Sequence, residues 1–214
     1  MSTYCSDEFM DAYFELIKDE NVVAILEQIF SFLPVDFRQT PFACDTEHTS
    51  EFDIESNVPF KIIATDTAGG FYCMLDDETN RIAMVFHGNY AGIIASDFLE
   101  FMHLLVHYHD WFSILHIPKK NSIQQAAAEI MASCDEISSG IAFPDNPYTY
   151  QSLRELLIQR LDLRRENYDI MRLFEHAASE HNQQVKFYQT RNYITNEAIR
   201  YELEPFVVRL PSGV

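Results

Sequence analysis

The sequence predicts an α+β fold in which helices flank a central, mostly antiparallel sheet. Apolar residues recur at helical spacing over residues 7–33, four short strand-like runs follow between residues 60 and 95, and helical spacing returns from residue 97. The connections between the four runs are short, which favours antiparallel neighbours. The chain has 214 residues, 47% hydrophobic and 14% aromatic, so it is long and apolar enough to bury a core.

The first 33 residues predict two helices. Apolar side chains fall on one helical face as far as Ile17 and on a second face from Val22 onward. The polar sequence DEN at residues 19–21 supplies a break and a new N-cap between them. Pro34 is expected to stop the helical run, because proline cannot continue a helix.

An acidic segment follows at residues 43–56, with the sequence ACDTEHTSEFDIES. It holds five acidic residues and no basic one, and it has no clear periodicity. Like charges at this density favour solvent or a cationic partner. We therefore expect an exposed loop or a sheet edge here.

Four strands are predicted in the centre of the chain. Each run is rich in β-branched and aromatic residues. A polar turn, DDETN at residues 76–80, separates the second run from the third, and HGNYAG at residues 87–92 joins the third to the fourth. The four runs are FKIIAT (60–65), GFYCML (70–75), RIAMVF (81–86) and GIIA (92–95).

Two of the six glycines stand between the first two strands, in the sequence DTAGG. A phosphate-binding loop needs a lysine after its glycines, and a dinucleotide site needs G-x-G-x-x-G opening a helix; neither pattern is present. Glycine permits a positive φ or a close backbone approach, and aspartate hydrogen-bonds nearby backbone in turns. The sequence therefore predicts that Asp66, Gly69 and Gly70 shape a bend between strands.

A helix is predicted to start at Asp97, because Asp97 with Glu100 resembles a capping box. Its apolar stripe, which should face the sheet, consists of Phe98, Phe101, Met102 and Leu105.

His103 and His107 stand on the same helix at the i, i+4 spacing of two zinc ligands, but Leu104 occupies the position where the zincin motif has glutamate. Nearby side chains that could complete a metal site are His109, Asp110 and His116. The other interpretation, which the sequence favours, places both histidines on the solvent side of the helix. We therefore predict no metal and no cofactor.

The chain is expected to divide into an α+β core at residues 1–118 and a mainly helical part at residues 119–214 that packs on the core. The best candidate for a linker is SSGIAFPDNPYTY at residues 138–150, with one glycine and two prolines. The expected elements of the second part are helices at residues 122–137, near 151–165 and near 169–181, a strand at 185–189, and a short helix capped by Thr195.

The formal net charge is −18, and most of it lies in one half of the chain. Residues 1–117 hold 20 acidic and four basic residues, whereas residues 118–214 hold 13 acidic and 11 basic residues. Direct nucleic-acid binding is not expected, because phosphate contacts need a basic footprint, and an anionic membrane would repel this half. A basic protein would be attracted. The plainer interpretation is that the charge serves solubility.

Neither a signal peptide nor a membrane span is expected. The N-terminus has no basic and no apolar region, and no run approaches the roughly 18–20 apolar residues that cross a bilayer. We therefore expect the protein to stay in the cytoplasm. The four cysteines lie far apart and form no C-x-x-C pair, so free and mostly buried thiols are expected: Cys5, Cys44, Cys73 and Cys134.

Catalysis has little support. The sequence has no G-x-S-x-G elbow and no cysteine in the context of a nucleophile. Three consecutive acids, Asp76, Asp77 and Glu78, fall in a polar turn, where such acids are solvated. Nucleophilic catalysis is therefore not supported, and the hypothesis of an enzyme rests only on the spacing of His103 and His107.

The segments IIATDTAGGFYCMLDD and RIAMVFHGNYAGIIASDFLEFMHLLV resemble the SUKH superfamily of Smi/Knr-like domains. Members typically show an apolar strand ending in A-x-D-x-x-G-G or similar, a second strand, a variable turn, a third strand and then an acid-containing aromatic helix start. The resemblance covers residues 58–108. The matching positions are Ala64, Asp66, Gly69, Gly70, Ile94, Ala95, Ser96, Phe98, Glu100, Phe101 and Leu105.

The resemblance implies a central, mostly antiparallel sheet flanked by helices, and it implies binding without enzymatic activity. Proteins of this superfamily include immunity proteins that neutralise a polymorphic toxin of the same bacterial cell, often a nuclease, by occluding it. The leading hypothesis is therefore an immunity protein whose partner is the C-terminal domain of a cognate toxin. The alternative is a cytoplasmic adaptor of the same fold with a partner other than a toxin.

The family motif marks the scaffold, so the partner-binding residues are expected elsewhere. An acidic inhibitor can mimic the phosphate backbone toward a basic nuclease and associate fast through electrostatic steering. We hypothesise that the N-terminal acids and the acidic segment form the contact. The candidate residues are Asp7, Glu8, Asp11, Glu15, Asp45, Glu47, Glu51, Asp53 and Glu55.

Overall fold

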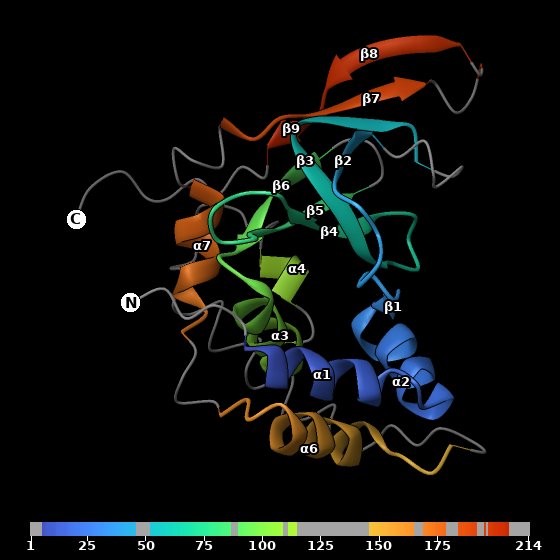
Figure 1. The fold of residues 1–214 in the computed structure, drawn as a ribbon, viewed down its shortest axis with the longest axis vertical. Coiled ribbons are helices and arrows are strands. Elements are labelled where there is room, and N and C mark those ends of the chain that lie inside the picture. The colour runs from blue at the N-terminus through green and yellow to red at the C-terminus, as the bar shows by residue number, and fades with distance from the viewer. Residues whose placement is uncertain are drawn as a thin grey trace.

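A sheet with helices packed against it forms the centre of the molecule, and within the described residues this sheet has nine strands (Figure 1). The structure is a computed structural model of the chain, and the predicted α+β class is confirmed. It describes residues 6–45, 52–86, 90–108, 111–114, 146–164, 169–178, 184–191, 195 and 197–205.

Groups of helices alternate with groups of strands along the chain. The helices are α1 (Asp7–Leu16), α2 (Glu20–Phe30), α3 (Phe98–His107), α4 (Trp111–Ile114), α6 (Tyr150–Arg160) and α7 (Met171–Ala178). The strands are β1 (Leu33–Pro34), β2 (Ala43–Asp45), β3 (Ile54–Thr65), β4 (Phe71–Leu75), β5 (Ile82–Phe86), β6 (Tyr90–Ala95), β7 (Phe187–Arg191), β8 (Ala198–Glu202) and β9 (Glu204–Pro205).

The four central strands overlap the four predicted runs, and each pairs with the next in antiparallel fashion. Strand β3 begins at Ile54, six residues earlier than predicted, because its first residues pair with β7. The order across the sheet is β8-β7-β3-β4-β5-β6-β9, with β1 and β2 pairing along β3. The pairing of β6 with β9 is the parallel one among the described strands. Strand β3 has 12 residues, enough to pair with four other strands along its length.

The central strands are apolar on both faces. In β4 all five residues are buried, and successive side chains of a strand point to opposite faces. Tyr72 and Met74 pack into the cluster beneath the helices, whereas Phe71, Cys73 and Leu75 pack into a second cluster on the other face. The sheet therefore needs a cover on each side.

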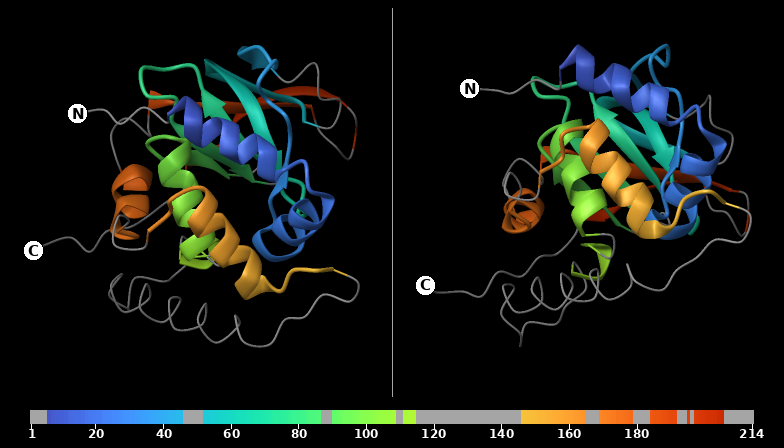
Figure 2. Two further views of the ribbon diagram at one scale, coloured as in Figure 1. Left: turned by 60° about the horizontal axis from the view of Figure 1, so that its bottom comes forward. Right: turned by 90° about the horizontal axis from the view of Figure 1, so that it is seen from below.

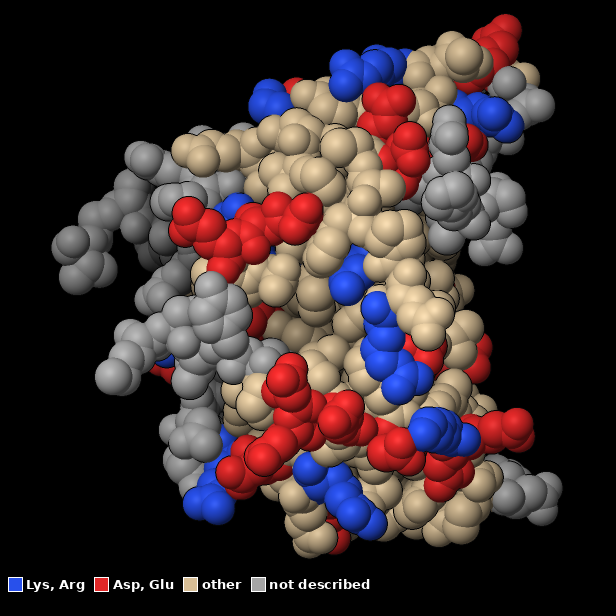
Figure 3. Space-filling view, in the orientation of Figure 1, with Lys and Arg blue, Asp and Glu red and all other residues tan. Residues whose placement is uncertain are grey.

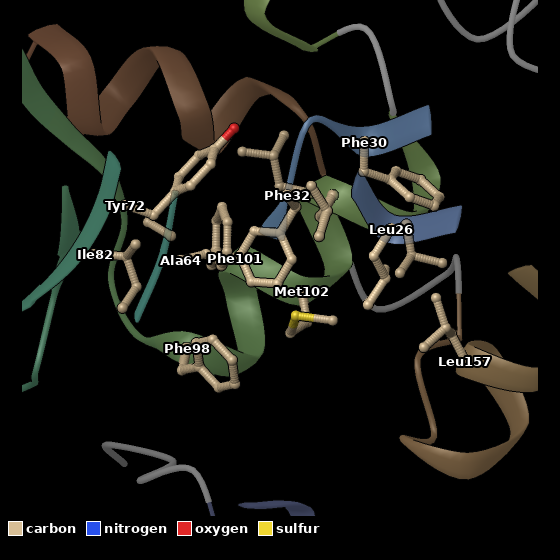
Figure 4. Packing of buried hydrophobic residues seen from close by; sticks show 14 of the residues in the cluster. Leu26, Phe30, Phe32, Ala64, Tyr72, Ile82, Phe98, Phe101, Met102 and Leu157 are labelled. Atoms are coloured by element: carbon tan, nitrogen blue, oxygen red, sulfur yellow. The ribbon is translucent and has the colours of Figure 1, made fainter. Parts of the chain in front are cut away.

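Helices α1, α2, α3 and α6 gather on one side of the sheet (Figures 1 and 2). Three aromatic rings connect the sheet to the helices: Phe32 lies 5.5 Å from Tyr72 and 5.6 Å from Phe101, and Tyr72 lies 5.2 Å from Phe101, between ring centroids. Figure 4 shows these rings turned toward one another, with Met102 and Leu26 beside them. Buried rings at such distances stabilise a core beyond the area they bury.

The second face is covered because the sheet curls until its two ends meet. Strand β8 pairs with β7 at one end of the order, and β9 pairs with β6 at the other, yet only Leu203 separates β8 from β9. The Leu203 amide donates to the carbonyl oxygen of Phe187 in β7 at 2.8 Å, and its side chain is 4% exposed within the second cluster. Residues 198–205 thus contain both the first strand of the sheet, β8, and the last, β9, which are joined by Leu203.

The predicted helix starts are confirmed at the N-terminus and at α3. Ser6 caps α1, and Asp19 caps α2 in the predicted break. Asp97 accepts from the Glu100 amide at 2.8 Å and begins α3. Ser31 ends α2 in a left-handed conformation before Pro34 is reached.

In the C-terminal part, α6 and α7 lie where two helices were expected, and β7 overlaps the expected strand. The short helix after Thr195 is wrong, because Ala198–Glu202 is strand β8, held by pairing with β7. The helix predicted at 122–137, and most of the linker predicted at 138–150, lie outside the described residues. Within the described ranges, no helix has both the length and the hydropathy needed to cross a membrane.

The sequence DTAGG forms the turn between β3 and β4, as the sequence indicated. The Asp66 carboxylate accepts from the amides of Ala68 at 2.7 Å and Gly70 at 2.8 Å, and the Asp66 amide donates to the Gly70 carbonyl. Gly69 has φ 90°, a region that side chains disfavour. A Cβ on Gly70 would lie 2.5 Å from the Val85 carbonyl oxygen and 2.7 Å from an Asp66 carboxylate oxygen.

Replacing Gly70 by valine should therefore destabilise the fold. We expect Gly70→Val to lower the free energy of unfolding by about 2–3 kcal/mol, because the added methyl groups press on β5 backbone that cannot move aside. Urea denaturation measures this, with Ala68→Val as the control, since Ala68 is an exposed residue of the same turn. Equal midpoints for the two variants would contradict this account of the turn.

Truncating Leu203 should open the closed sheet. We expect Leu203→Ala to cost about 2–5 kcal/mol of unfolding free energy, as for other large-to-small changes in a core. The control is Tyr201→Ala in β8, whose side chain is 45% exposed and whose loss should cost less than about 1 kcal/mol. If thermal unfolding finds Leu203→Ala no worse than Tyr201→Ala, closure of the sheet contributes nothing to stability.

Candidate functional site

Helix α1 presents four acidic side chains to solvent. Its other side is buried through Phe9, Tyr13 and Phe14, which fixes the orientation of the helix. The four exposed acids, which we call the α1 ridge, are Asp7, Glu8, Asp11 and Glu15. Figure 3 shows acidic side chains gathered along this helix. These four predicted contact residues thus share one surface.

Helix stability alone explains only part of the α1 ridge. Asp7 and Glu8 lie in the first turn, where the helix dipole favours negative charge. Asp11 and Glu15 lie beyond that turn, and Asp7, Asp11 and Glu15 follow one another at i, i+4 spacing, where like charges repel. Glu15 forms an ion pair with Lys18 at 2.5 Å, but in the described part of the chain Asp7, Glu8 and Asp11 form none.

The predicted acids of residues 43–56 are placed differently. Asp45 is exposed on the edge strand β2. Asp53 and Glu55 form ion pairs with bases of the β7–β8 hairpin, Asp53 with Arg191 at 3.5 Å and Glu55 with Arg200 at 3.2 Å. Glu47 and Glu51 lie outside the described residues.

The two groups of acids do not form one continuous patch. On the face shown in Figure 3, basic side chains lie between the acids of α1 and those higher on the sheet. Asp53 and Glu55 therefore help to hold the β7–β8 hairpin, whereas three of the four acids of the α1 ridge form no ion pair among the described residues.

A groove runs along each side of α1. The first, about 530 Å³ in volume, is lined by Asp7 and Asp11 of the helix and, opposite them, by Lys61 and Phe37. The second, about 610 Å³, lies toward α6 and α7 and is lined among others by Glu8, Glu100 and His103. Asp97, the N-cap of α3, lines both grooves. The α1 ridge therefore has a depression on either side.

Glu100 is the best-held carboxylate in the second groove, at 5% exposure. It accepts from the Ser96 amide at 2.6 Å, from Arg172 at 3.1 Å, and shares a hydrogen bond with His176 at 2.7 Å. Burial acts to raise the pKa of Glu100, but the hydrogen bonds with His176 and Ser96 outweigh it and lower the pKa to about 2. Because Arg172 and His176 belong to α7, this carboxylate ties α7 to the start of α3.

The expectation that His103 and His107 line the solvent side of α3 is wrong. Their exposed fractions are 6% and 2%, because Arg154 of α6 and the chain near Leu163 cover that side of the helix. His107 Nε2 lies 2.9 Å from the Leu163 carbonyl oxygen. Burial lowers the pKa of His103, which favours its neutral form.

The described residues contain no group of side chains that could form a metal site. No three histidine, cysteine, aspartate or glutamate side chains gather there in a way that would hold an ion. His109, Asp110 and His116, named above as possible further ligands, lie outside those ranges. Cys73 is buried, and burial raises the pKa of its thiol, so it does not supply a thiolate nucleophile at neutral pH.

The residues of the family-like motif lie in the scaffold, and of these Ser96 lines the second groove and Phe98 the first. Asp66, Gly69 and Gly70 make the β3–β4 turn, the Ser96 amide holds Glu100, and the rings of Phe98 and Phe101 are buried. Sequence reasoning missed Lys61 and the Glu100 network. Lysine in the strand-like run FKIIAT was the available signal for the first, since it interrupts an apolar strand.

Comparisons with known proteins add no relative. A scan against protein-family models, a search of curated proteins and a search of solved structures each returned no match.

The Glu100 network predicts a pH-dependent contribution to stability. A folded-state pKa of about 2, against the usual 4.5, contributes about 3 kcal/mol above pH 4.5 and loses that contribution as the pH falls toward 2. We expect Glu100→Gln to be less stable than the parent by roughly this amount at pH 7, with the difference narrowing below pH 4.5.

Urea unfolding at pH 7 and at pH 3 measures the difference, with exposed Glu8→Gln as the control. A Glu100→Gln deficit that stays constant between these pH values would mean that Glu100 acts by shape and not by charge.

Proposed function

We propose that this chain is an immunity protein that binds and neutralises a cognate bacterial toxin by occlusion, with a basic nuclease as the leading candidate. The observation that carries the proposal is the α1 ridge, with four exposed acids on a helix whose other side is firmly packed. The resemblance of residues 58–108 to the SUKH superfamily supports the toxin as partner. The proposal places the protein in the cytoplasm and assigns it no catalytic activity.

Electrostatic attraction accounts for the choice of a basic partner. Asp7, Glu8 and Asp11 have no ion-pair partner among the described side chains, so their charge is available to another molecule. A nuclease has a basic groove for the phosphate backbone, and a ridge of carboxylates fits such a groove by charge. Complementary charge also speeds association, which an inhibitor of a toxin needs.

Occlusion needs shape as well as charge. The two grooves beside α1 make the ridge stand out, so a partner groove can close around it. Because α1 is anchored by buried rings, little conformational entropy is lost when a partner binds. The ridge therefore suits tight one-to-one binding better than a loose charged tail would.

Charge reversal on α1 tests the function. We expect Asp7→Lys/Asp11→Lys to lose protection when the chain is co-expressed with the toxin C-terminal domain encoded by the neighbouring upstream reading frame. The association rate should fall at least about tenfold at low salt, and its salt dependence should flatten. Cell survival and stopped-flow association measure the two effects.

The matched control is Glu197→Lys/Glu204→Lys, which makes the same change in net charge on exposed residues at β8 and β9. Circular dichroism checks that both variants fold. Loss of protection in both variants alike would attribute the effect to total charge and remove α1 from the interface. Absence of any protection by the parent chain would reject the toxin as partner.

A further inference from the structure

Lys61 differs from the other basic residues of the acidic half. Of the four basic residues in 1–117, three pair with a carboxylate: Lys18 with Glu15, Arg38 with Asp36, and Arg81 with Asp77. Lys61 has no carboxylate oxygen within 4.0 Å among the described residues. In a half-chain with 20 acidic residues, a lysine with no such pair needs an explanation.

The position of Lys61 makes its charge costly. It lies in β3 opposite Met74 of β4, a residue of the cluster beneath the helices. Its ammonium lies 4.5 Å from the ring centroid of Phe42 and 5.3 Å from that of Phe37. Burial lowers the pKa of Lys61, and the Asp76 carboxylate offsets part of this effect. The rings attract the cation without neutralising it.

The groove at Lys61 has an apolar floor. Phe37, Met74 and Phe98 line it and are themselves 1–7% exposed, so they form a fixed surface. Its volume, about 530 Å³, is within the range of ligand pockets and is ample for a large apolar side chain. Arg38 also lines the groove, but it is already paired with Asp36. Lys61 therefore supplies the cation that has no carboxylate beside it among the described residues, and next to the apolar floor it suits an apolar group with a carboxylate attached.

We propose that this groove anchors the partner by taking a large apolar side chain, and that Lys61 pairs with a carboxylate on the adjacent residue of the partner. That the ligand is a protein rests on the function proposed above. That it carries an apolar group and a carboxylate rests on the residues of the groove alone. Asp7 and Asp11 belong both to the α1 ridge and to the rim of the groove, so a protein that covers the ridge covers the groove too. The partner is then basic overall with one carboxylate in register with Lys61, which adds specificity to attraction.

Two short peptides test the groove. The probes are acetyl-Ala-Phe-Glu-Ala-amide and its neutral match, acetyl-Ala-Phe-Gln-Ala-amide. With a net charge of −18, the whole protein favours the neutral peptide, so only a local cation reverses that order. We expect the glutamate peptide to bind about threefold more tightly or better, and to shift the NMR signal of a ¹³C-methylated Lys61 but not that of Lys18.

Two lysine variants complete the test. Lys61→Met should keep the apolar contact and lose the preference for the glutamate peptide, whereas Lys18→Met should leave the preference unchanged. Three outcomes would overturn the proposal: a glutamine peptide that binds as well as the glutamate peptide, a Lys61 signal that does not move, or a preference that survives Lys61→Met. Much tighter binding of free N-acetylphenylalanine than of either peptide would also overturn it, by assigning the groove to a small molecule.

The peptide assay is independent of the toxin experiment. If the parent chain fails to protect cells but the glutamate peptide binds at Lys61, the proposed function fails and the chemistry of the groove stands. If protection depends on α1 but the peptides show no preference, this inference fails alone.

Discussion

The apolar character of both sheet faces is the constraint on which the rest of the structure depends. All five residues of β4 are buried, so each face needs a cover, and the two covers are of different kinds. Helices cover one face, while the sheet covers the other by curling back on itself. Curling brings the first strand, β8, close to the last, β9, and Leu203 joins the two. Leu203 is therefore part of the same core as the central strands.

The same constraint makes α1 a suitable carrier of charge. Its inner side contributes Tyr13, whose ring centroid lies 4.8 Å from that of Phe98 and 5.3 Å from that of Phe14. Repulsion between acids four residues apart costs a few tenths of a kcal/mol per pair, which is small beside the burial of such rings. The outer side can therefore hold carboxylates in a fixed arrangement. Because a groove lies on each side of the helix, these carboxylates protrude from the surface.

Local sequence signals predicted much of the fold, and they failed where distant residues decide the outcome. Runs of β-branched and aromatic residues with short turns located the central strands, helical spacing located α1, and polar caps located the starts of α2 and α3. The helix after Thr195 was wrong because β8 is a strand only by virtue of its pairing with β7. His103 and His107 were misplaced because α6 follows them by more than 40 residues, and nothing in α3 itself shows that it will be covered.

The same limit applies to the charges of the candidate site. The sequence gives the number of charged residues, but it does not show which of them the fold brings together. Glu55 of β3 and Arg200 of β8 are 145 residues apart in the chain, yet their side chains pair across β7, which lies between the two strands. Such pairs use part of the acidic excess to hold the sheet, whereas Asp7 and Asp11 remain open at the ridge. Lys61 is the opposite case, because it is a cation with no carboxylate oxygen within 4.0 Å among the described residues. Net charge alone therefore does not indicate which charges folding leaves unpaired.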